Sequence, residues 1–202
     1  MAIFNFGNEN NDKDSSWHND GYIVGTYFTC PDNGTIDEIK AYLTKVIGAK
    51  VKCAIYKHSD GSKLGVTEEH TFTDANEEWV TFAIEGSVSV EKDEVYWLFF
   101  WSNSSSVNFW YASSVPTISD AMNKSYNSWP DTFSGLGASG REYDIYAVCS
   151  TIPLPVSLAA EINPNAFTGY HCFQEQFQKR RGDGKIPYKT PDGTLYRSAP
   201  SG

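Results

Sequence analysis

Basic residues are scarce in this 202-residue chain, which has 16 Lys and Arg against 25 Asp and Glu and a net charge of −9. Surfaces that bind nucleic acid need clustered Lys and Arg to neutralise phosphates, so this balance argues against a nucleic-acid partner for the body of the chain. The sequence also has no apolar run near the roughly 20 residues that a membrane helix requires. We therefore expect neither a nucleic-acid partner nor membrane insertion.

The first residues lack the basic start and the apolar run of roughly 7–15 residues that define a secretory signal. The chain opens with Met-Ala-Ile-Phe-Asn-Phe-Gly and turns polar from Asn8 to Ser16. If this is the native start, it predicts that the protein does not enter the general secretion pathway.

Cysteine is sparse and dispersed, at positions 30, 53, 149 and 172. No Cys-x-x-Cys pair and no Cys/His cluster with metal-ligand spacing occurs, so we expect no zinc site. Cys30 and Cys149 lie at the ends of the first and last predicted strands, where a disulfide is an open alternative to two thiols. Asp32, Asn33 and Asp37 offer oxygen atoms near the first predicted turn, but their spacing is too loose to indicate a calcium site.

Catalytic motifs are absent as well. The sequence contains no G-x-S-x-G elbow, H-E-x-x-H motif, phosphate-binding loop or G-x-G-x-x-G fingerprint. His171 and Cys172 are adjacent, and adjacent positions on a helix point about 100° apart, which disfavours a thiol–imidazole pair. Acidic pairs such as Glu77-Glu78 flank predicted strands, where solvated charges are the rule. We therefore expect a protein that is not an enzyme and needs no cofactor or metal.

Aromatic residues, in contrast, are abundant, with 12 Phe, 12 Tyr and 6 Trp. Large rings favour the pleated, half-buried surfaces of sheets. From residue 21 to residue 150, short apolar runs alternate with Gly, Pro, Asn and Asp turns. The links are too short for the crossovers of a parallel sheet, so about eight or nine strands predict an all-β sandwich. The predicted strands are 21–30, 35–44, 50–57, 66–72, 79–84, 88–90, 95–101, 107–112 and 143–150.

The order of strand edges in this region resembles a known family. The segments that carry the resemblance are Phe28-Thr-Cys-Pro-Asp-Asn-Gly-Thr-Ile36, Ala41-Tyr-Leu43, Val51-Lys-Cys-Ala-Ile-Tyr56, Trp79-Val-Thr-Phe82, Val95-Tyr-Trp-Leu98 and Tyr143-Asp-Ile-Tyr-Ala147. Their pattern resembles the jelly-roll, carbohydrate-binding-module-like β-sandwiches that recur in microbial surface proteins and in viral (phage) structural proteins. The resemblance covers about residues 21–150. It implies a jelly-roll fold and a non-catalytic unit that binds a ligand or builds a structure.

The composition changes after Ser150. Residues 152–156, Ile-Pro-Leu-Pro-Val, predict a stiff, extended connector. Asn163-Pro164 is typical of a helix start, and an aromatic face follows at three- and four-residue spacing before Gly182 ends the predicted helix. The last residues, with two prolines, predict an extended arm. We therefore divide the chain into a polar N-terminal segment (1–20), a sandwich (21–150) and a Pro-linked helix and arm (151–202).

Charge and aromatic side chains make this C-terminal segment a candidate for contact with other subunits. Residues 179–202 hold six basic and two acidic residues, a net charge of +4, which leaves −13 for the rest of the chain. A basic arm beside an acidic body favours contact between copies, and equally contact within one chain. The candidate contact residues are Phe167, Tyr170, Phe173, Phe177, Arg180, Arg181 and Lys185.

Tryptophans suggest a second kind of site. Trp101 and Trp110 lie on either side of the loop 102–106, so we expect them near one end of the sandwich. Together with Trp129 they are candidates for a platform on which a sugar ring stacks. Most rings in a sandwich nevertheless belong to the core, because alternate positions of each strand face inward.

Two hypotheses about function follow. The first is a structural protein of an assembly, a virion component such as a capsid decoration, tail or fibre protein, which forms homo-oligomers or contacts other virion proteins. A surface-type jelly roll without a secretion signal suits a virus particle, because lysis rather than export releases it. The second is a glycan-binding module of a protein at the cell surface, with a cell-surface glycan as its partner.

Overall fold

The computed structural model describes residues 2–11, 14–18, 21–113, 118–135, 137, 139–151, 188–189 and 195–196. Contacts divide the chain into two units, Met1–Pro153 and Leu154–Gly202. All secondary structure described in them consists of strands, which confirms the all-β class for this part of the chain. The predicted C-terminal helix lies outside the described residues. Nowhere in the described part does a helix occur that is long and apolar enough to cross a membrane.

Thirteen strands are described in the first unit, where the sequence predicted eight or nine. They are β1 (Ile3–Gly7), β2 (Ser15–His18), β3 (Tyr22–Thr29), β4 (Gly34–Thr44), β5 (Lys50–Lys57), β6 (Lys63–Val66), β7 (His70–Thr71), β8 (Glu77–Val90), β9 (Val95–Ser102), β10 (Asn108–Ser113), β11 (Ser119–Asn123), β12 (Arg141–Tyr143) and β13 (Ile145–Thr151).

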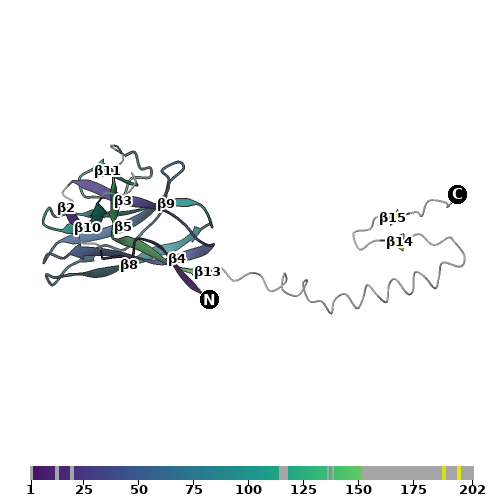
Figure 1. Cartoon of the computed structure of the whole chain (residues 1–202), viewed down its shortest axis with the longest axis horizontal. Helices are drawn as coiled ribbons and strands as arrows, with labels where there is room; N and C mark the ends of the chain where they lie inside the picture. Colours follow the sequence, from purple (N-terminus) through teal and green to yellow (C-terminus); the bar gives the residue numbers. More distant parts are fainter. Residues whose placement is uncertain are drawn as a thin grey trace, which may run out of the picture. The chain divides into compact units, whose positions relative to one another are not determined.

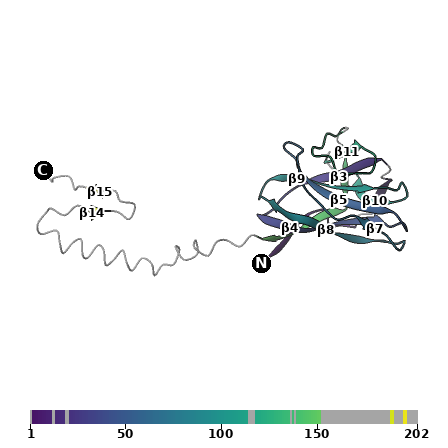
Figure 2. The same ribbon diagram turned by 180° about the vertical axis from the view of Figure 1, so that it is seen from behind.

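These strands form two antiparallel sheets that lie as two layers (Figure 1). Sheet A has the order β1-β13-β4-β10-β12, with β8 beside β4 and β2 beside β10. Sheet B has the order β11-β3-β9-β5-β6, with β7 beside β5. Seen from behind, β4 and β8 again share one layer, and β3, β5 and β9 the other (Figure 2). The first unit is therefore a β-sandwich.

Alternation along β4 shows how the sequence selects the faces of sheet A. Ile39, Ala41 and Leu43 are completely buried against sheet B, whereas Lys40 points outward and is half-buried. A shift in the β4–β8 register between Ile36 and Glu38 keeps Ile36 on the buried side as well. Such a bulge adds one residue to a strand and changes which side chains face inward beyond it.

Aromatic stacking fills the space between the sheets. The ring of Phe100 on β9 stacks on Phe109 of β10, with centroids 3.6 Å apart and planes inclined by 15°. Tyr143 meets Phe100 edge-on at 5.0 Å. Burying a large apolar side chain stabilises a fold by roughly 1.5–3 kcal/mol. Rings from both sheets thus anchor the layers to each other.

Sheet B is also covered on its outer face. The loop at residues 124–135 lies over β5 and β9, where the hydroxyl of Tyr56 donates a hydrogen bond to the carbonyl of Pro130 at 2.6 Å. Trp101 is completely buried and Trp129 is 8% exposed in this second aromatic core. The continuous apolar run of β9 follows from this cover, because a strand buried on both faces cannot alternate with polar residues.

The two sheets join at one corner. An isolated bridge pairs Thr67, which follows β6, with Ile84 of β8, and the amide of Glu68 donates to the carbonyl of Ala83 at 3.1 Å. The hydroxyl of Thr67 accepts a hydrogen bond from the amide of Cys53 at 2.8 Å. This corner links strands of sheet B to an edge strand of sheet A.

The sandwich extends beyond the predicted range of residues 21–150. β1 pairs with β13 from Ile3 opposite Ser150 to Gly7 opposite Tyr146, and β2 pairs with β10. These strands were not predicted because they are short and the segment around them is polar. β8 is one long strand where two runs, 79–84 and 88–90, were expected.

The second unit contributes two short strands to the described residues. β14 (Tyr188–Lys189) pairs antiparallel with β15 (Leu195–Tyr196), and Tyr188 lies opposite Tyr196. The sequence predicted an extended arm in this region, and these four residues are extended.

Candidate functional site

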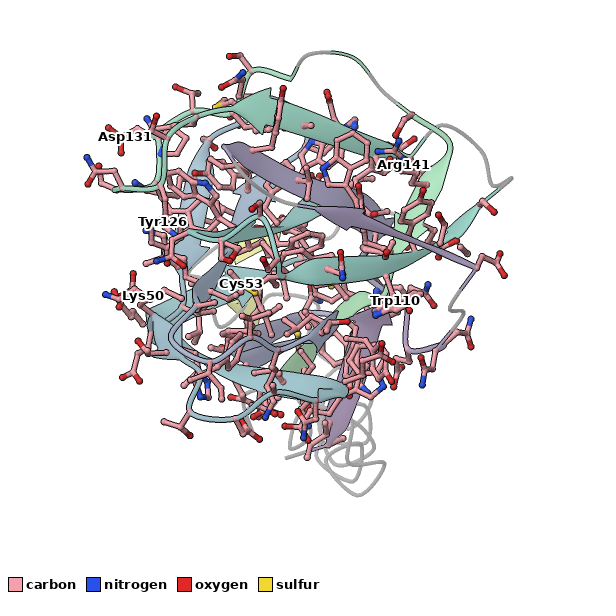
Figure 3. All side chains as sticks on the ribbon, turned by 90° about the vertical axis from the view of Figure 1, so that its left-hand side faces the viewer. Lys50, Cys53, Trp110, Tyr126, Asp131 and Arg141 are labelled. Carbon is pink, nitrogen blue, oxygen red and sulfur yellow. The ribbon has the colours of Figure 1, made fainter. Side chains whose placement is uncertain are left out.

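The three tryptophans predicted as a sugar platform do not share one surface. Trp101 and Trp129 pack together on the outer side of sheet B, with ring centroids 5.3 Å apart. Trp110 on β10 belongs to sheet A, where its Nε1 donates to the hydroxyl of Thr44 at 3.3 Å. Figure 3 shows Trp110 on the opposite side of the sandwich from Tyr126. Trp101 has no exposed surface and is therefore a core residue, because the loop at residues 124–135 covers it.

Lys52 of β5 contacts aromatic rings both on β9 and in the loop at 124–135. Its ammonium lies 4.8 Å from the ring centre of Trp101, 4.5 Å from that of Tyr126 and 5.8 Å from that of Trp129. It also donates a hydrogen bond to the carbonyl of Asn127. Burial lowers the pKa of Lys52, because partial removal from water disfavours a cation. We call Lys52 and the three rings the Lys52 cage.

A pocket of about 320 Å³ opens beside this cage. We call it the Lys52 pocket, and its lining residues are Lys52, Lys63, Val66, Thr67, Glu69, Glu85, Ser128 and Trp129. These residues come from β5, β6, the segment between β6 and β7, β8 and the loop at 124–135, so the pocket lies where the loop meets the corner between the sheets. None of them except Trp129 was among the predicted site residues.

Ion pairs position two of the four charged residues that line this pocket, Lys63 and Glu69. Lys63 bonds the carboxylate of Asp131 at 2.8 Å, and Lys50 bonds Glu69 at 2.6 Å. The hydroxyl of Tyr126 donates to the second carboxylate oxygen of Glu69 at 2.8 Å. The lysine partners hold the pKa values of Asp131 and Glu69 below their usual values, because a nearby cation favours the ionised carboxylate. The carboxylates therefore carry charge at neutral pH.

The outer face of sheet A carries a second aromatic surface. Tyr42 of β4 pairs directly with Trp79 of β8, with ring centroids 5.6 Å apart. Tyr146 of β13 lies 5.0 Å from Trp79, nearly edge to face. Trp79 and Tyr146 are half-buried and Tyr42 is 6% exposed. We call these three residues the sheet A strip.

Polar groups surround the sheet A strip. Lys40 lies opposite Tyr146 on one side and Thr81 on the other, and its ammonium bonds Glu38 at 2.9 Å. Partial burial raises the pKa of Tyr146. Gly7 of β1 pairs with Tyr146, and a Cβ atom there would lie 2.5 Å from the Cα atom of Tyr146. The neighbouring strand therefore places no side chain over this end of the strip.

The sequence predicts that these side chains face outward, but not that they lie side by side. Tyr42 and Trp79 alternate with the buried residues Leu43 and Val80, so an outward orientation follows from the period of a strand. That the two strands are neighbours, and that β13 adds Tyr146 to the same face, depends on sheet order, which short-range patterns do not encode.

The other residues considered in the sequence analysis form three groups. Cys30, Cys53 and Cys149 are buried thiols, and burial raises the pKa of Cys149 to about 12. The carboxylates considered for calcium make bonds within the chain, because Asp32 accepts from the amide of Asn33 at 2.8 Å and Asp37 from the hydroxyl of Ser150 at 2.5 Å. The proposed contact residues lie outside the described residues. They are Phe167, Tyr170, Phe173, Phe177, Arg180, Arg181 and Lys185.

Within the described part of the chain, no group of three or more His, Cys, Asp or Glu side chains is arranged to hold a metal ion. No family model matches the chain, and no curated protein matches it in sequence.

Proposed function

We propose that this chain is a non-catalytic structural protein of an assembly, in the form of a virion component such as a capsid decoration, tail or fibre protein. The sandwich, with jelly-roll topology, is the presented body, and the C-terminal segment contacts neighbouring subunits. The proposal is carried by two observations, the division of the chain into two units and the concentration of basic residues near the end of the second unit. Residues 179–202 have a net charge of +4 and the remaining residues −13.

Ion pairing on the sandwich supports contact through charge. Four of its lysines, Lys40, Lys45, Lys50 and Lys63, bond carboxylates of the sandwich itself, and Lys45 bonds both Asp74 at 2.7 Å and Glu78 at 2.6 Å. Carboxylates outnumber these cations, so acidic surface remains for a basic segment from another copy. Complementary charge of this kind speeds association and selects the partner.

The assembly hypothesis is tested by the mass of the full-length protein in solution. We expect oligomers that dissociate when Arg180 and Arg181 are replaced by Glu, and that weaken with added salt, because exposed charges are screened beyond about 10 Å at 0.1 M. A matched variant, Lys92→Glu with Lys57→Glu, makes the same charge change on the sandwich and should leave the mass unchanged. A monomer at every protein and salt concentration contradicts the proposal.

A second function, binding of an extended glycan at a cell surface, is favoured by the sheet A strip. The apolar C–H face of a sugar ring packs against an aromatic ring, and hydroxyls around it bond to charged groups such as Lys40 and Glu38. The strip crosses β8, β4 and β13, and the half-buried rings of Trp79 and Tyr146 are available to neighbouring sugar units. The contacts of Tyr42, Trp79 and Tyr146 carry this alternative.

Affinity electrophoresis through gels that contain soluble polysaccharides tests the glycan hypothesis. We expect retardation of the full chain on at least one polysaccharide and its loss in Trp79→Ala. The matched control is Ile3→Ala, which removes another apolar side chain of sheet A that is 70% exposed. If none of the polysaccharides changes the migration of the full chain, binding at the strip is contradicted.

A further inference from the structure

We propose that the Lys52 pocket binds one neutral, hydroxyl-rich saccharide unit. This inference rests on the second function above, glycan binding by the sandwich, and adds a site on the other sheet. The pocket volume of about 320 Å³ is at the lower end of the range for ligand pockets, about 300–1,000 Å³. Such a volume suits a single sugar ring rather than a chain of them.

The charges around the pocket select against an ionic ligand. Two cations, Lys52 and Lys63, and two carboxylates, Glu69 and Glu85, line it. An anion is attracted by the two ammonium groups but repelled by both carboxylates. A cation is attracted by the carboxylates and repelled by the ammonium groups. A ligand without net charge avoids either repulsion and keeps the existing ion pairs intact.

Hydroxyl groups match the hydrogen-bonding capacity of the lining. An ammonium has three N–H donors and a carboxylate accepts about four hydrogen bonds. The bonds from Lys63 to Asp131 and from Lys50 to Glu69 use part of this capacity and fix the side chains. A sugar hydroxyl accepts from an ammonium and donates to a carboxylate, so neighbouring hydroxyls can bridge Lys52 and Glu85.

The apolar side chains of the pocket lining are Val66 and Trp129, and only 8% of Trp129 is exposed. Trp129 is held in place by Trp101 at 5.3 Å and Tyr56 at 6.3 Å, so it offers an edge rather than an open face. Its buried Nε1 has no acceptor among the described residues. Binding therefore depends on polar contacts more than on ring stacking.

The Lys52 pocket and the sheet A strip are independent sites. Tyr126, Asp131 and Lys50, which surround the pocket, lie together on one side of the sandwich in Figure 3. The strip belongs to the outer face of the other sheet. One domain can therefore hold a single terminal sugar at the pocket while an extended chain occupies the strip.

Saturation-transfer NMR on the full chain tests the pocket with glucose, galactose, mannose and N-acetylglucosamine, each measured separately. We expect transfer to at least one sugar, and affinity at least tenfold weaker in the double variant Lys52→Met with Glu85→Gln. The matched control, Lys92→Met with Glu91→Gln, makes the same chemical changes at exposed positions and should bind as the parent does. Thermal melting of each variant confirms that it is folded.

Three outcomes overturn the proposal: no transfer to any of the four sugars, equal affinity in the pocket variant, or tighter binding of acetate or glycine than of any sugar. The hypotheses of binding at the pocket and of binding at the strip can be contradicted separately. Trp79→Ala should abolish polysaccharide retardation without altering transfer to the single sugars. If retardation is absent while transfer depends on Lys52 and Glu85, the strip is contradicted and the pocket stands.

Discussion

The ammonium of Lys52 on β5 lies 4.5 Å from the ring centre of Tyr126, a residue of the loop at 124–135. This contact joins the loop to sheet B at the point where the hydroxyl of Tyr126 also bonds Glu69. Lys52 is half-buried, so part of its carbon chain is covered while its ammonium lies over the rings beside the pocket, and long basic side chains commonly bury their stems in this way. The stem and the charge of Lys52 thus have different roles.

Two substitutions separate those roles. Lys52→Met keeps most of the stem and removes the charge, whereas Lys52→Ala removes both. We expect the free energy of unfolding of the alanine variant to be about 1–2 kcal/mol lower than that of the methionine variant, because each buried CH₂ contributes about 0.8 kcal/mol. Urea unfolding measures the difference. Equal stability of the two variants would show that the stem covers nothing.

The difference in burial between two tryptophans predicts a difference in stability. Trp101→Ala leaves a cavity in the aromatic core of sheet B and should cost about 3–5 kcal/mol. Trp110→Ala removes a half-buried ring from sheet A and should cost less than half as much. Urea midpoints of the two variants decide the matter, and an equal loss would contradict the burial of Trp101 beneath the loop.

Alkaline pH should weaken the fold through Tyr143. Burial raises its pKa to about 12, against about 10 in an unfolded chain. A raised pKa means that the folded state keeps its proton longer, so the contribution is fully present below pH 10 and is lost as pH rises through 12. The loss amounts to up to about 3 kcal/mol. Unfolding free energies between pH 9 and 12 should fall less steeply in Tyr143→Phe than in the parent.

Three thiols should resist modification in the folded protein. Cys30, Cys53 and Cys149 are buried, and burial raises the pKa of each, which leaves little reactive thiolate at pH 8. In a Cys172→Ser background we expect iodoacetamide to label no thiol within minutes in buffer and three in 8 M urea, measured by intact mass. One label instead of three in urea without reductant would reveal a disulfide between two of these cysteines, and reduction of the same sample should then restore three labels.

Much of the strand pattern was predictable from short-range alternation. β4, β5 and β9 fall almost where the runs 35–44, 50–57 and 95–101 placed them. β1 escaped prediction because Ile3–Gly7 is a short segment whose stability comes from pairing with β13, far away in the sequence. Pairing over such a separation leaves no periodic trace within the strand itself.

The candidate sites were predictable only in part. The unbroken apolar run from Tyr96 to Trp101 indicates a strand buried on both faces, but not which segment covers it. Residues 129–133, Trp-Pro-Asp-Thr-Phe, carry no helical or strand period, and their packing on sheet B depends on tertiary contacts. The Lys52 pocket combines residues of β5, β6, β8 and this loop with others, so no single stretch of the sequence predicts it.

The pairing of β1 with β13 also determines how the sandwich responds to mechanical load. Ala2 and Thr151 are joined by two hydrogen bonds, one of them from the amide of Thr151 to the carbonyl of Ala2 at 2.9 Å. A pulling force applied between these residues acts on neighbouring ends of antiparallel strands and loads their hydrogen bonds one after another. The ladder therefore opens like a zipper, starting at Ile3 and Ser150, and yields at lower force than a pair of strands sheared along their length. β1 is the element that such tension would peel away first, and its loss would remove the buried ring of Phe6 from Tyr96, whose ring centre lies 6.0 Å away.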